Sequence, residues 1–460
     1  MIQFSKKDKD KVLNAIKQGN IDAADISFPN LIDTIMLKMK NIGVLAKLTK
    51  LFTEKRGENS SIPLDIILSL AITAKMKLKT SLTDVAFAVT DSELLSELGW
   101  NIWDNDRGLE KGLLEEGTMR NMINKYEAKE IVESYNDYSQ NIIMPELKIL
   151  PQIHILDYTK ILVNLNNSNY ENSEVIRFEG ESTRGYKLAT LRGLMDDGGI
   201  IEEIAFDSIK PHDMELSRDI LLKSKALKEG DILINDRGFI SRSVTNTLKT
   251  NKKVDTYIPA KKNMMIYEQA VSIAKLENQW QTHPNKKRKT QEIQLVKELG
   301  SSWRSENPKE DVDLIACVVH DTKDDEYYVF MTTDVEKTAK QIINTYEIRP
   351  EIEEDYRQIK DFWKLEDFKS TKYNFIVFHI IMTLIGYTYF QLYKNMEEGR
   401  EFSKKSLPVV LKNYKEKKPK YVIIYTGQYF AIFTFIEFIQ LYAGCSEEVR
   451  KLLEPTLALV

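Results

Sequence analysis

The chain has 460 residues, with 65 Lys or Arg against 69 Asp or Glu, and a formal net charge of −4. Its 42% hydrophobic share supports a sizeable core and excludes a disordered polyelectrolyte, and the negative charge excludes a uniformly basic, histone-like DNA binder. The two cysteines, Cys317 and Cys445, exclude a disulfide framework and a four-cysteine zinc site and favour a reducing compartment. The length predicts about two to four domains.

Residues 1–150 are predicted to be helical. Pro63 begins an apolar run with helical spacing, and the patterns Ser81-x-x-Asp84 and Thr90-x-x-Glu93 are capping boxes for two further short helices. Short helices in series are typical both of helix-turn-helix DNA readers and of plain bundle packing. We therefore expect a helical N-terminal domain, with binding of a DNA end and simple packing both left open.

From residue 151 the pattern changes to short, turn-bounded strands. Five strands are predicted before residue 260, with one helix before the fourth and another before the fifth: Ile153–Thr159, Tyr186–Met195, Ile200–Ile209, Asp231–Asn235 and Val254–Pro259. This order indicates a mixed α/β sheet. Residues 261–335 are less regular, with three further predicted strands at Gln291–Leu295, Leu314–His320 and Tyr327–Thr333. We interpret them as a β-containing insertion within a domain that spans residues 151–400.

Two apolar stretches, Phe375–Tyr393 and Tyr421–Gly444, are each long enough to cross a bilayer. Glu437 near the middle of a lone span would be costly, and the aromatic side chains are scattered along both stretches instead of gathering at their ends. Both are predicted to be buried core helices, the second within a helical C-terminal region at residues 401–460. A membrane-associated or scaffolding protein is the rival interpretation.

Two aspartates end predicted strands. Asp157 ends the first strand and Asp236 ends the fourth, where it precedes Arg237-Gly238-Phe239. Ligands of open α/β sheets bind beyond strand ends, so the two side chains could face one ligand. Aspartate is also common in ordinary turns after strands, and this alternative stays open for each residue taken alone.

A long helix is predicted from about Glu336 to Trp363, with Pro350 kinking or restarting it. Tyr346, Arg349, Glu353 and Lys360 fall on one stripe of such a helix. An aromatic, two cations and a carboxylate are not typical of a core-facing stripe. The alternative is a solvated face, since Arg349 and Glu353 can form an i,i+4 ion pair.

These motifs together resemble one family. The ordered set is Asp157-Tyr158-Thr159, then Asp236-Arg237-Gly238-Phe239, then Tyr346-x2-Arg349-x3-Glu353-x6-Lys360. It resembles the DDE transposases of bacterial insertion sequences, and the last motif matches the Tyr-Arg-Glu-Lys signature of the insertion-sequence-four superfamily. The resemblance covers about residues 150–395. It implies a ribonuclease-H-like catalytic core in which Asp157, Asp236 and Glu353 bind two Mg²⁺ or Mn²⁺ ions, as oxygen ligands suit these ions.

The resemblance also implies the reaction and its partners. A cut-and-paste transposase would cleave double-stranded DNA at the terminal inverted repeats of its own element and join the freed 3′-hydroxyl to target DNA. Tyr346, Arg349 and Lys360 would contact phosphates beside the cleaved bond. We expect a homodimer in the synaptic complex, a cytoplasmic, nucleoid-associated location and no membrane. A metal-dependent nuclease and a domesticated DNA-binding relative with the same fold are the alternatives.

Two basic runs could bind DNA phosphates electrostatically, although the net charge of the chain is negative. Residues 249–289 hold ten Lys or Arg against three Asp or Glu, and residues 400–420 hold eight against two. We expect Arg237, Lys286, Lys287 and Arg288 to contact DNA, although a solvated surface is the alternative for any basic run. Trp280 and Trp303 are candidates for stacking on an extruded base, with packing inside the insertion as the alternative.

Overall fold

The computed structural model describes residues 4–52, 55, 62–89, 91–101, 113–178, 180–196, 198–299, 303, 311–413 and 421–457. The chain divides into two compact units, the first made of residues 1–134 and 359–460 and the second of residues 135–358. The predicted boundaries near residues 150 and 400 therefore differ from the observed ones. The apolar helix after residue 372 packs with N-terminal helices, so both ends of the chain belong to one unit.

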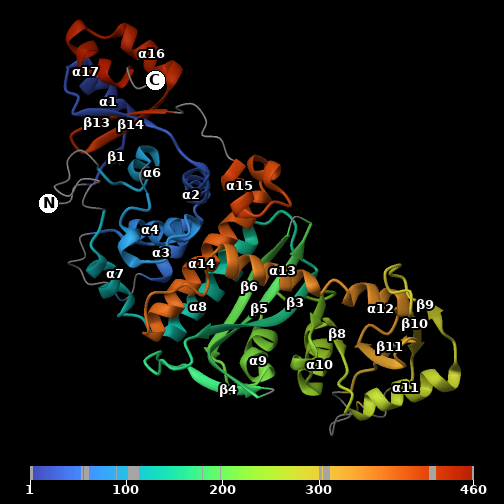
Figure 1. Cartoon of the computed structure of the whole chain (residues 1–460). Helices are drawn as coiled ribbons and strands as arrows, with labels where there is room; N and C mark the ends of the chain where they lie inside the picture. Colours follow the sequence, from blue (N-terminus) through green and yellow to red (C-terminus); the bar gives the residue numbers. More distant parts are fainter. Residues whose placement is uncertain are drawn as a thin grey trace. The chain divides into compact units, whose positions relative to one another are not determined.

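The second unit is built on a large sheet, drawn in green to orange in Figure 1. The described strands of this sheet are β3 (Ile153–Val163), β4 (Glu174–Phe178), β5 (Glu181–Met195), β6 (Gly198–Ser208), β7 (Ile232–Asn235), β8 (Asp255–Pro259), β9 (Gln281–Thr282), β10 (Gln291–Val296), β11 (Ile315–Asp321) and β12 (Glu326–Thr332). All eight predicted strands are confirmed. Strands β6, β5 and β3 are antiparallel neighbours, whereas β3, β7 and β8 are parallel, so the strands of the first half lie in the order β6-β5-β3-β7-β8.

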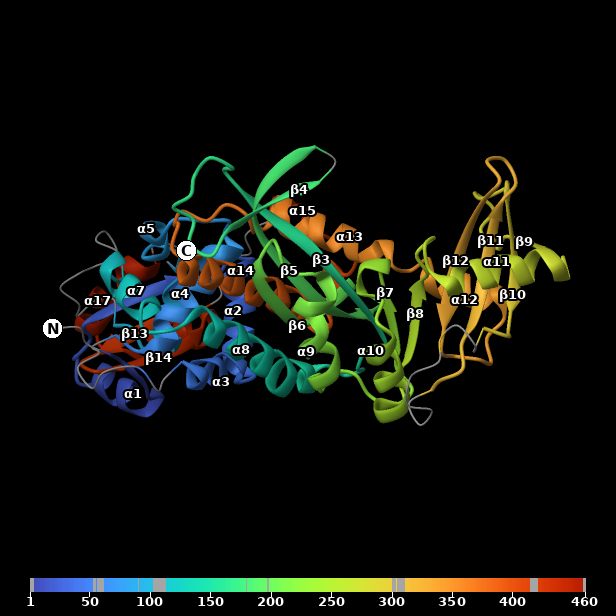
Figure 2. The same cartoon turned by 90° about the horizontal axis from the view of Figure 1, so that it is seen from below.

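The segment predicted to be an insertion extends this same sheet. Strand β12 pairs antiparallel with β8, and β11, β10 and β9 continue outward from it. Helix α11 (Met265–Glu277) packs on these strands through Ile266, Ala270 and Ala274. Figure 2 shows the hairpins and α11 gathered beyond β8. An open strand edge at β8 would expose unpaired backbone groups, and β12 satisfies them.

Helices cover both faces of the sheet. They are α9 (Asp213–Lys223), α10 (Arg242–Thr247), α12 (Ala339–Tyr346) and α13 (Pro350–Arg357). Helices α9 and α10 pack against Leu156 and Leu233, while α12 and α13 pack against Ile155 and Ile234 on the opposite face. Pro350 occupies the first turn of α13, which confirms that the long predicted helix restarts there. Because side chains alternate along a strand, Asp157 lies on the same face as Ile155, under α12 and α13.

The first unit contains a helical bundle, whose longest helix is α14. Its helices are α1 (Lys9–Lys17), α2 (Leu31–Asn41), α3 (Val44–Leu51), α4 (Leu64–Met76), α5 (Leu82–Val85), α6 (Ser92–Glu97), α7 (Glu116–Ile123), α14 (Tyr373–Lys394), α15 (Leu407–Asn413), α16 (Phe435–Gly444) and α17 (Glu447–Leu457), and α8 (Ala128–Tyr138) crosses the unit boundary. Among the described residues, α14 has the length and apolar composition of a membrane span, but its apolar window is entirely buried. The prediction of a buried core helix at Phe375–Tyr393 is confirmed.

The C-terminal region is not helical throughout, and the prediction of one helix over Tyr421–Gly444 is wrong. Strands β13 (Tyr421–Thr426) and β14 (Tyr429–Thr434) form a hairpin before α16. The hairpin turns at Gly427, which adopts a positive φ of 51°. With β1 (Lys6–Lys7) and β2 (Ala23–Ser27) it forms a small sheet that joins the two ends of the chain. Alternating β-branched and aromatic residues favour strands, and pairing with β2 decides between strand and helix.

Candidate active site

Strand register brings the two aspartates together. Strands β3 and β7 run parallel, and their last paired residues are Leu156 and Asn235. Asp157 and Asp236 are the next residues along each strand, so they lie side by side on neighbouring strands. Strand β3 continues to Val163, so Asp157 lies inside a strand and not at its end as predicted. The sharp departure after Asp236 depends on Gly238, where a Cβ would lie 2.5 Å from the carboxylate of Asp213.

Helix α13 carries the third carboxylate, and a buried tyrosine fixes the helix to the sheet. The hydroxyl of Tyr356 donates to the carbonyl oxygen of Asp157 at 2.8 Å and lies 2.7 Å from the Thr190 hydroxyl on β5. Beside it, Asp355 forms an ion pair with Arg192, a buried residue of β5. Glu353 lies on the opposite, exposed side of the helix. The sequence interpretation missed these anchoring residues, although Ile352, Asp355 and Tyr356 have the i, i+3, i+4 spacing of a packed face.

One guanidinium group links all three carboxylates. Nη2 of Arg349 lies 2.9 Å from Oδ2 of Asp157 and 3.8 Å from Oδ2 of Asp236. Nη1 of the same side chain lies 2.8 Å from Oε1 of Glu353. The i,i+4 pair that the sequence offered as a solvated salt bridge therefore exists, but it forms part of a four-residue cluster. Asp157, Asp236 and Glu353 therefore meet at a single cation, although they are separated by 79 and 117 positions along the chain.

The electrostatics of the cluster result from this crowding. Burial raises the pKa of Asp157 to about 6; Arg349 opposes that shift, while Asp236 and Glu353 add to it. Burial disfavours the charge on Arg349, but the surrounding carboxylates outweigh burial and its pKa is raised. Arg349 is thus the counter-ion that allows three carboxylates to share one place. Its Nε is buried and has no hydrogen-bond partner among the described residues.

The donor set has the chemistry of a divalent-metal site, with the guanidinium in the position of the cation. Among the described residues, no three His, Cys, Asp or Glu side chains lie close enough together to hold one metal ion. Asp157 and Asp236 nevertheless converge on one nitrogen atom, and Mg²⁺ or Mn²⁺ binds proteins through one or two carboxylates, with water and phosphate completing the shell. The residues therefore fit such an ion once Arg349 turns away from them.

The other two residues of the helix signature lie on either side of this cluster in sequence. Tyr346 ends α12 and packs on Phe330 of β12, with ring centroids 4.7 Å apart. Burial raises the pKa of the Tyr346 phenol, Arg349 opposes that shift, and Asp236 and Asp157 add to it. Tyr346 and Arg349 line the same cavity. Lys360 comes after α13 in a π-helical turn of the first unit, and its Nζ lies 2.9 Å from Glu366. Its contact with phosphate stays a prediction.

Part of the basic run lies beside α12. The side chain of Arg288 pairs with Glu347 at 2.6 Å, and Asn285 donates to the same carboxylate at 3.3 Å. Glu347 is two residues from Arg349, so these contacts hold the loop of residues 285–289 next to the start of α13. Lys286, Lys287 and Lys289 are exposed and form no ion pair within the described parts of the chain. Arg237 is exposed directly after Asp236. Residues 414–420 of the second basic run lie outside the described residues.

The two tryptophans differ in exposure, and base stacking requires an exposed ring. Trp303 is 3% exposed within the hydrophobic core of the extended sheet, and its Nε1 donates to Asn246 at 2.9 Å. In this structure it is a packing residue, which favours the packing alternative for Trp303. Trp280 is half-buried and packs on His320 and Tyr327. The aromatic side chains that do line a cavity beside Arg349, of about 490 Å³, are Tyr328, Phe330 and Tyr346.

Comparison with known proteins agrees with this geometry. No curated protein matches the sequence. The family model described as the transposase DDE domain matches residues 156–389, slightly more than half of the chain. The match begins one residue before Asp157 and includes Asp236, Arg349 and Glu353. The chain therefore belongs to the family of the transposase DDE domain, whose members act on DNA.

Proposed function

We propose that this transposase cuts the inverted-repeat ends of its own element and joins them to target DNA at the site formed by Asp157, Asp236 and Glu353. The observation that carries the proposal is the meeting of these three carboxylates, from β3, the end of β7 and α13, at the guanidinium of Arg349. Membership of the insertion-sequence-four superfamily is part of the same proposal, since its Tyr-Arg-Glu-Lys signature includes Arg349 and Glu353.

The sheet order supports a ribonuclease-H-like catalytic core. Three antiparallel strands are followed by two parallel ones, in the order β6-β5-β3-β7-β8. The strands β3 and β7 are neighbours, and they carry the two aspartates at adjacent positions. In an α/β sheet, ligands bind beyond the carboxyl ends of the strands, and Asp236 lies at that end of β7.

DDE transposase domains generally use divalent metal ions. We propose that Asp157 contributes to holding two Mg²⁺ or Mn²⁺ ions, with Asp236 and Glu353 each completing one coordination sphere. Bound there, the ions would supply activation of the attacking hydroxyl and neutralisation of the charge on the leaving oxygen.

The chain's own residues position the DNA for this chemistry. Arg349 exchanges its carboxylate partners for a phosphate oxygen next to the cleaved bond, because an arginine fork suits either kind of anion. Tyr346 and Lys360 contact neighbouring phosphates. Tyr356 keeps Asp157 and α13 at a fixed spacing through its two hydrogen bonds. No nucleophilic side chain is needed, as water attacks first and the freed 3′-hydroxyl attacks the target phosphate afterwards.

The exposed lysines of the 285–289 loop are proposed to hold the DNA duplex beside the site. They are tied to α12 through Arg288 and Glu347, so their charge lies on the same side of the unit as Arg349. Phosphate contacts of this kind position a duplex without reading its sequence. Homodimer formation on paired ends, independence of membranes and a cytoplasmic, nucleoid-associated location complete the proposal.

The experiment uses the purified full chain and labelled duplexes that carry the inverted repeats flanking its gene. Cleavage and 3′-end joining are measured in Mg²⁺ and in Mn²⁺ for wild type and for Asp157→Ala, Asp236→Ala and Glu353→Ala. Each substitution should abolish both steps together and leave binding of the end intact. The matched control is Glu354→Ala, which removes an exposed neighbouring carboxylate that pairs with Arg357 and Gln358.

Three outcomes would change the proposal. Cleavage without joining in the wild type would make the chain a nuclease with this fold. End binding without cleavage in either metal would favour a domesticated DNA-binding relative. Full joining by Glu353→Ala would remove the three-carboxylate mechanism altogether.

A further inference from the structure

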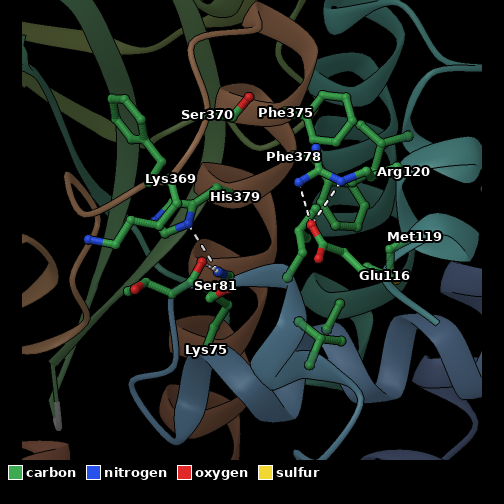
Figure 3. A pocket seen from close by; sticks show the side chains of 16 residues that line it. Lys75, Ser81, Glu116, Met119, Arg120, Lys369, Ser370, Phe375, Phe378 and His379 are labelled. Atoms are coloured by element: carbon green, nitrogen blue, oxygen red, sulfur yellow. Dashed lines mark hydrogen bonds and ion pairs between the residues drawn. The ribbon is translucent and has the colours of Figure 1, made fainter. Parts of the chain in front are cut away.

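The first unit contains a cavity that the proposed reaction does not use. It has a volume of about 140 Å³ and lies between α4, α7, the start of α14 and residues 368–370 (Figure 3). Its lining includes apolar groups, among them Met119, Phe375 and Phe378, and polar ones, among them Lys75, His379, Ser81 and Ser370. A cavity lined by both aromatic rings and a buried cation differs from an ordinary packing defect, which is apolar on all sides.

Lys75 is the unusual member of the lining. It is only 4% exposed, and its ammonium group forms no ion pair with any carboxylate of the described chain. Its partners are neutral: Nδ1 of His379 at 3.0 Å, and two carbonyl oxygens, of Lys79 and Thr80, at 3.4 Å each. A buried cation without a contacting anion is costly. Burial lowers the pKa of Lys75 to about 8, and Asp367 and Asp84, which form no ion pair with it, oppose that shift.

The imidazole of His379 is neutral. Burial and the neighbouring Lys75 hold its pKa well below the usual range. Its Nε2 lies 3.1 Å from the carbonyl oxygen of Lys364, so Nε2 carries the proton and Nδ1 accepts from Lys75. Figure 3 shows this pair on one side of the cavity and the Arg120–Glu116 pair on the other.

The remaining charges of the lining are already compensated. Arg120 is paired with Glu116, and Lys369 is paired with Asp367. Of the described residues that line the cavity, Lys75 is the cation that lacks an anion. An anionic ligand would therefore gain a direct ion pair with a cation that has already been desolvated by the fold.

We propose that this cavity binds a small organic acid, with its carboxylate on Lys75 and its apolar body against Phe375 and Phe378. The volume limits that body to about one benzene ring, since an apolar cavity of about 150 Å³ accepts benzene. Binding neutralises the buried ammonium and stabilises the first unit. A duplex phosphate is a poorer occupant, because its sugar neighbours would have to enter a space of this size with it.

The test uses benzoate as the probe on the full chain, with binding followed by calorimetry and by the melting temperature. Wild type should bind benzoate saturably. It should bind benzamide, the neutral analogue, at least about tenfold more weakly. A tenfold difference in affinity corresponds to about 1.4 kcal/mol, and an ion pair to a desolvated cation contributes more than this. Lys75→Met keeps the length of the side chain and should lose the preference for the acid. Lys79→Met is the matched control, because the exposed Lys79 lies just beyond the end of the same helix and outside the lining.

A second variant, Ala71→Met, fills the cavity from α4 without changing its charge and should prevent binding of both compounds. The proposal is overturned if wild type shows no saturable benzoate binding, if benzamide binds as tightly as benzoate, or if Lys75→Met binds benzoate like the wild type. Inorganic phosphate that binds as tightly as benzoate would overturn the apolar half of the site.

Discussion

A buried cluster of His154, Glu202 and Asp231 at the start of β3 allows the stability of the second unit to be predicted as a function of pH. His154 lies at the start of β3, with Nδ1 2.6 Å from Glu202 and Nε2 3.1 Å from Asp231. Burial disfavours its charge, but the two carboxylates outweigh burial and raise the pKa of His154 to about 9. Gly193 lies opposite on β5, and a Cβ there would lie 2.7 Å from Glu202, so the missing side chain lets Glu202 reach across the strand. The cluster joins β3 to the start of β7, and the register of these two strands places Asp157 next to Asp236.

The magnitude depends on the difference between the folded and unfolded pKa of the imidazole. Below pH 6.5 both states of His154 are protonated, and the cluster contributes fully to the free energy of unfolding. Between pH 6.5 and about 9 only the folded protein keeps the proton, so this contribution falls as the pH rises. At 1.36 kcal/mol per pKa unit, the total loss is roughly 3 kcal/mol, complete above pH 9.

The assay is urea unfolding between pH 6 and pH 9.5, followed by hydrogen exchange in peptides of β3. The reference is the double variant His154→Gln/Glu202→Gln, because His154→Gln alone would leave Glu202 buried without its cation. Wild type should lose roughly 3 kcal/mol more than the double variant across this range. Parallel curves for the two proteins would contradict the prediction, since they would show that His154 does not carry a proton that the unfolded chain gives up.

Three further predictions concern the site and its DNA. Arg349→Ala leaves three carboxylates without their shared cation, so its melting temperature should fall more in EDTA than in Mn²⁺, and equal falls would contradict the counter-ion role. Tyr356→Phe removes the hydroxyl that bonds β3 and β5; we expect unfolding in urea to cost about 1–3 kcal/mol less and end cleavage to slow, whereas unchanged values would make the hydroxyl dispensable. Glutamate at Lys286, Lys287 and Lys289 should weaken binding to every duplex alike in fluorescence anisotropy and make the dependence of log affinity on log salt shallower by about 3 units; an unchanged slope would place the loop outside the interface.

Local sequence patterns were sufficient to predict the strands and the signature residues. Alternating apolar residues between turns are a local signal, and the strands predicted from Ile153 to Thr333 are all present. Pro350 is a local signal as well. Proline has no backbone N–H to donate inside a helix, so a helix ends before it and a new one begins with it in the first turn. The order of Asp157, Asp236 and Glu353 along these elements, together with the family resemblance, was enough to indicate a shared site, although Asp157 lies inside β3 and not at its carboxyl end.

The partners of these residues depend on tertiary packing. Arg349 pairs with two aspartates as well as with Glu353 because of the way α13 packs on β3. Tyr356 and the Arg192–Asp355 ion pair fix this packing, and they connect parts of the chain that are distant in sequence. The hairpin at Tyr421–Thr434 shows the same dependence. Its residues suit a helix core or a strand about equally by hydrophobicity, and pairing with β2, almost 400 positions earlier, selects the strand. Local patterns specify how a segment can fold, whereas long-range pairing selects its neighbours, and the chemistry of this site depends on neighbours.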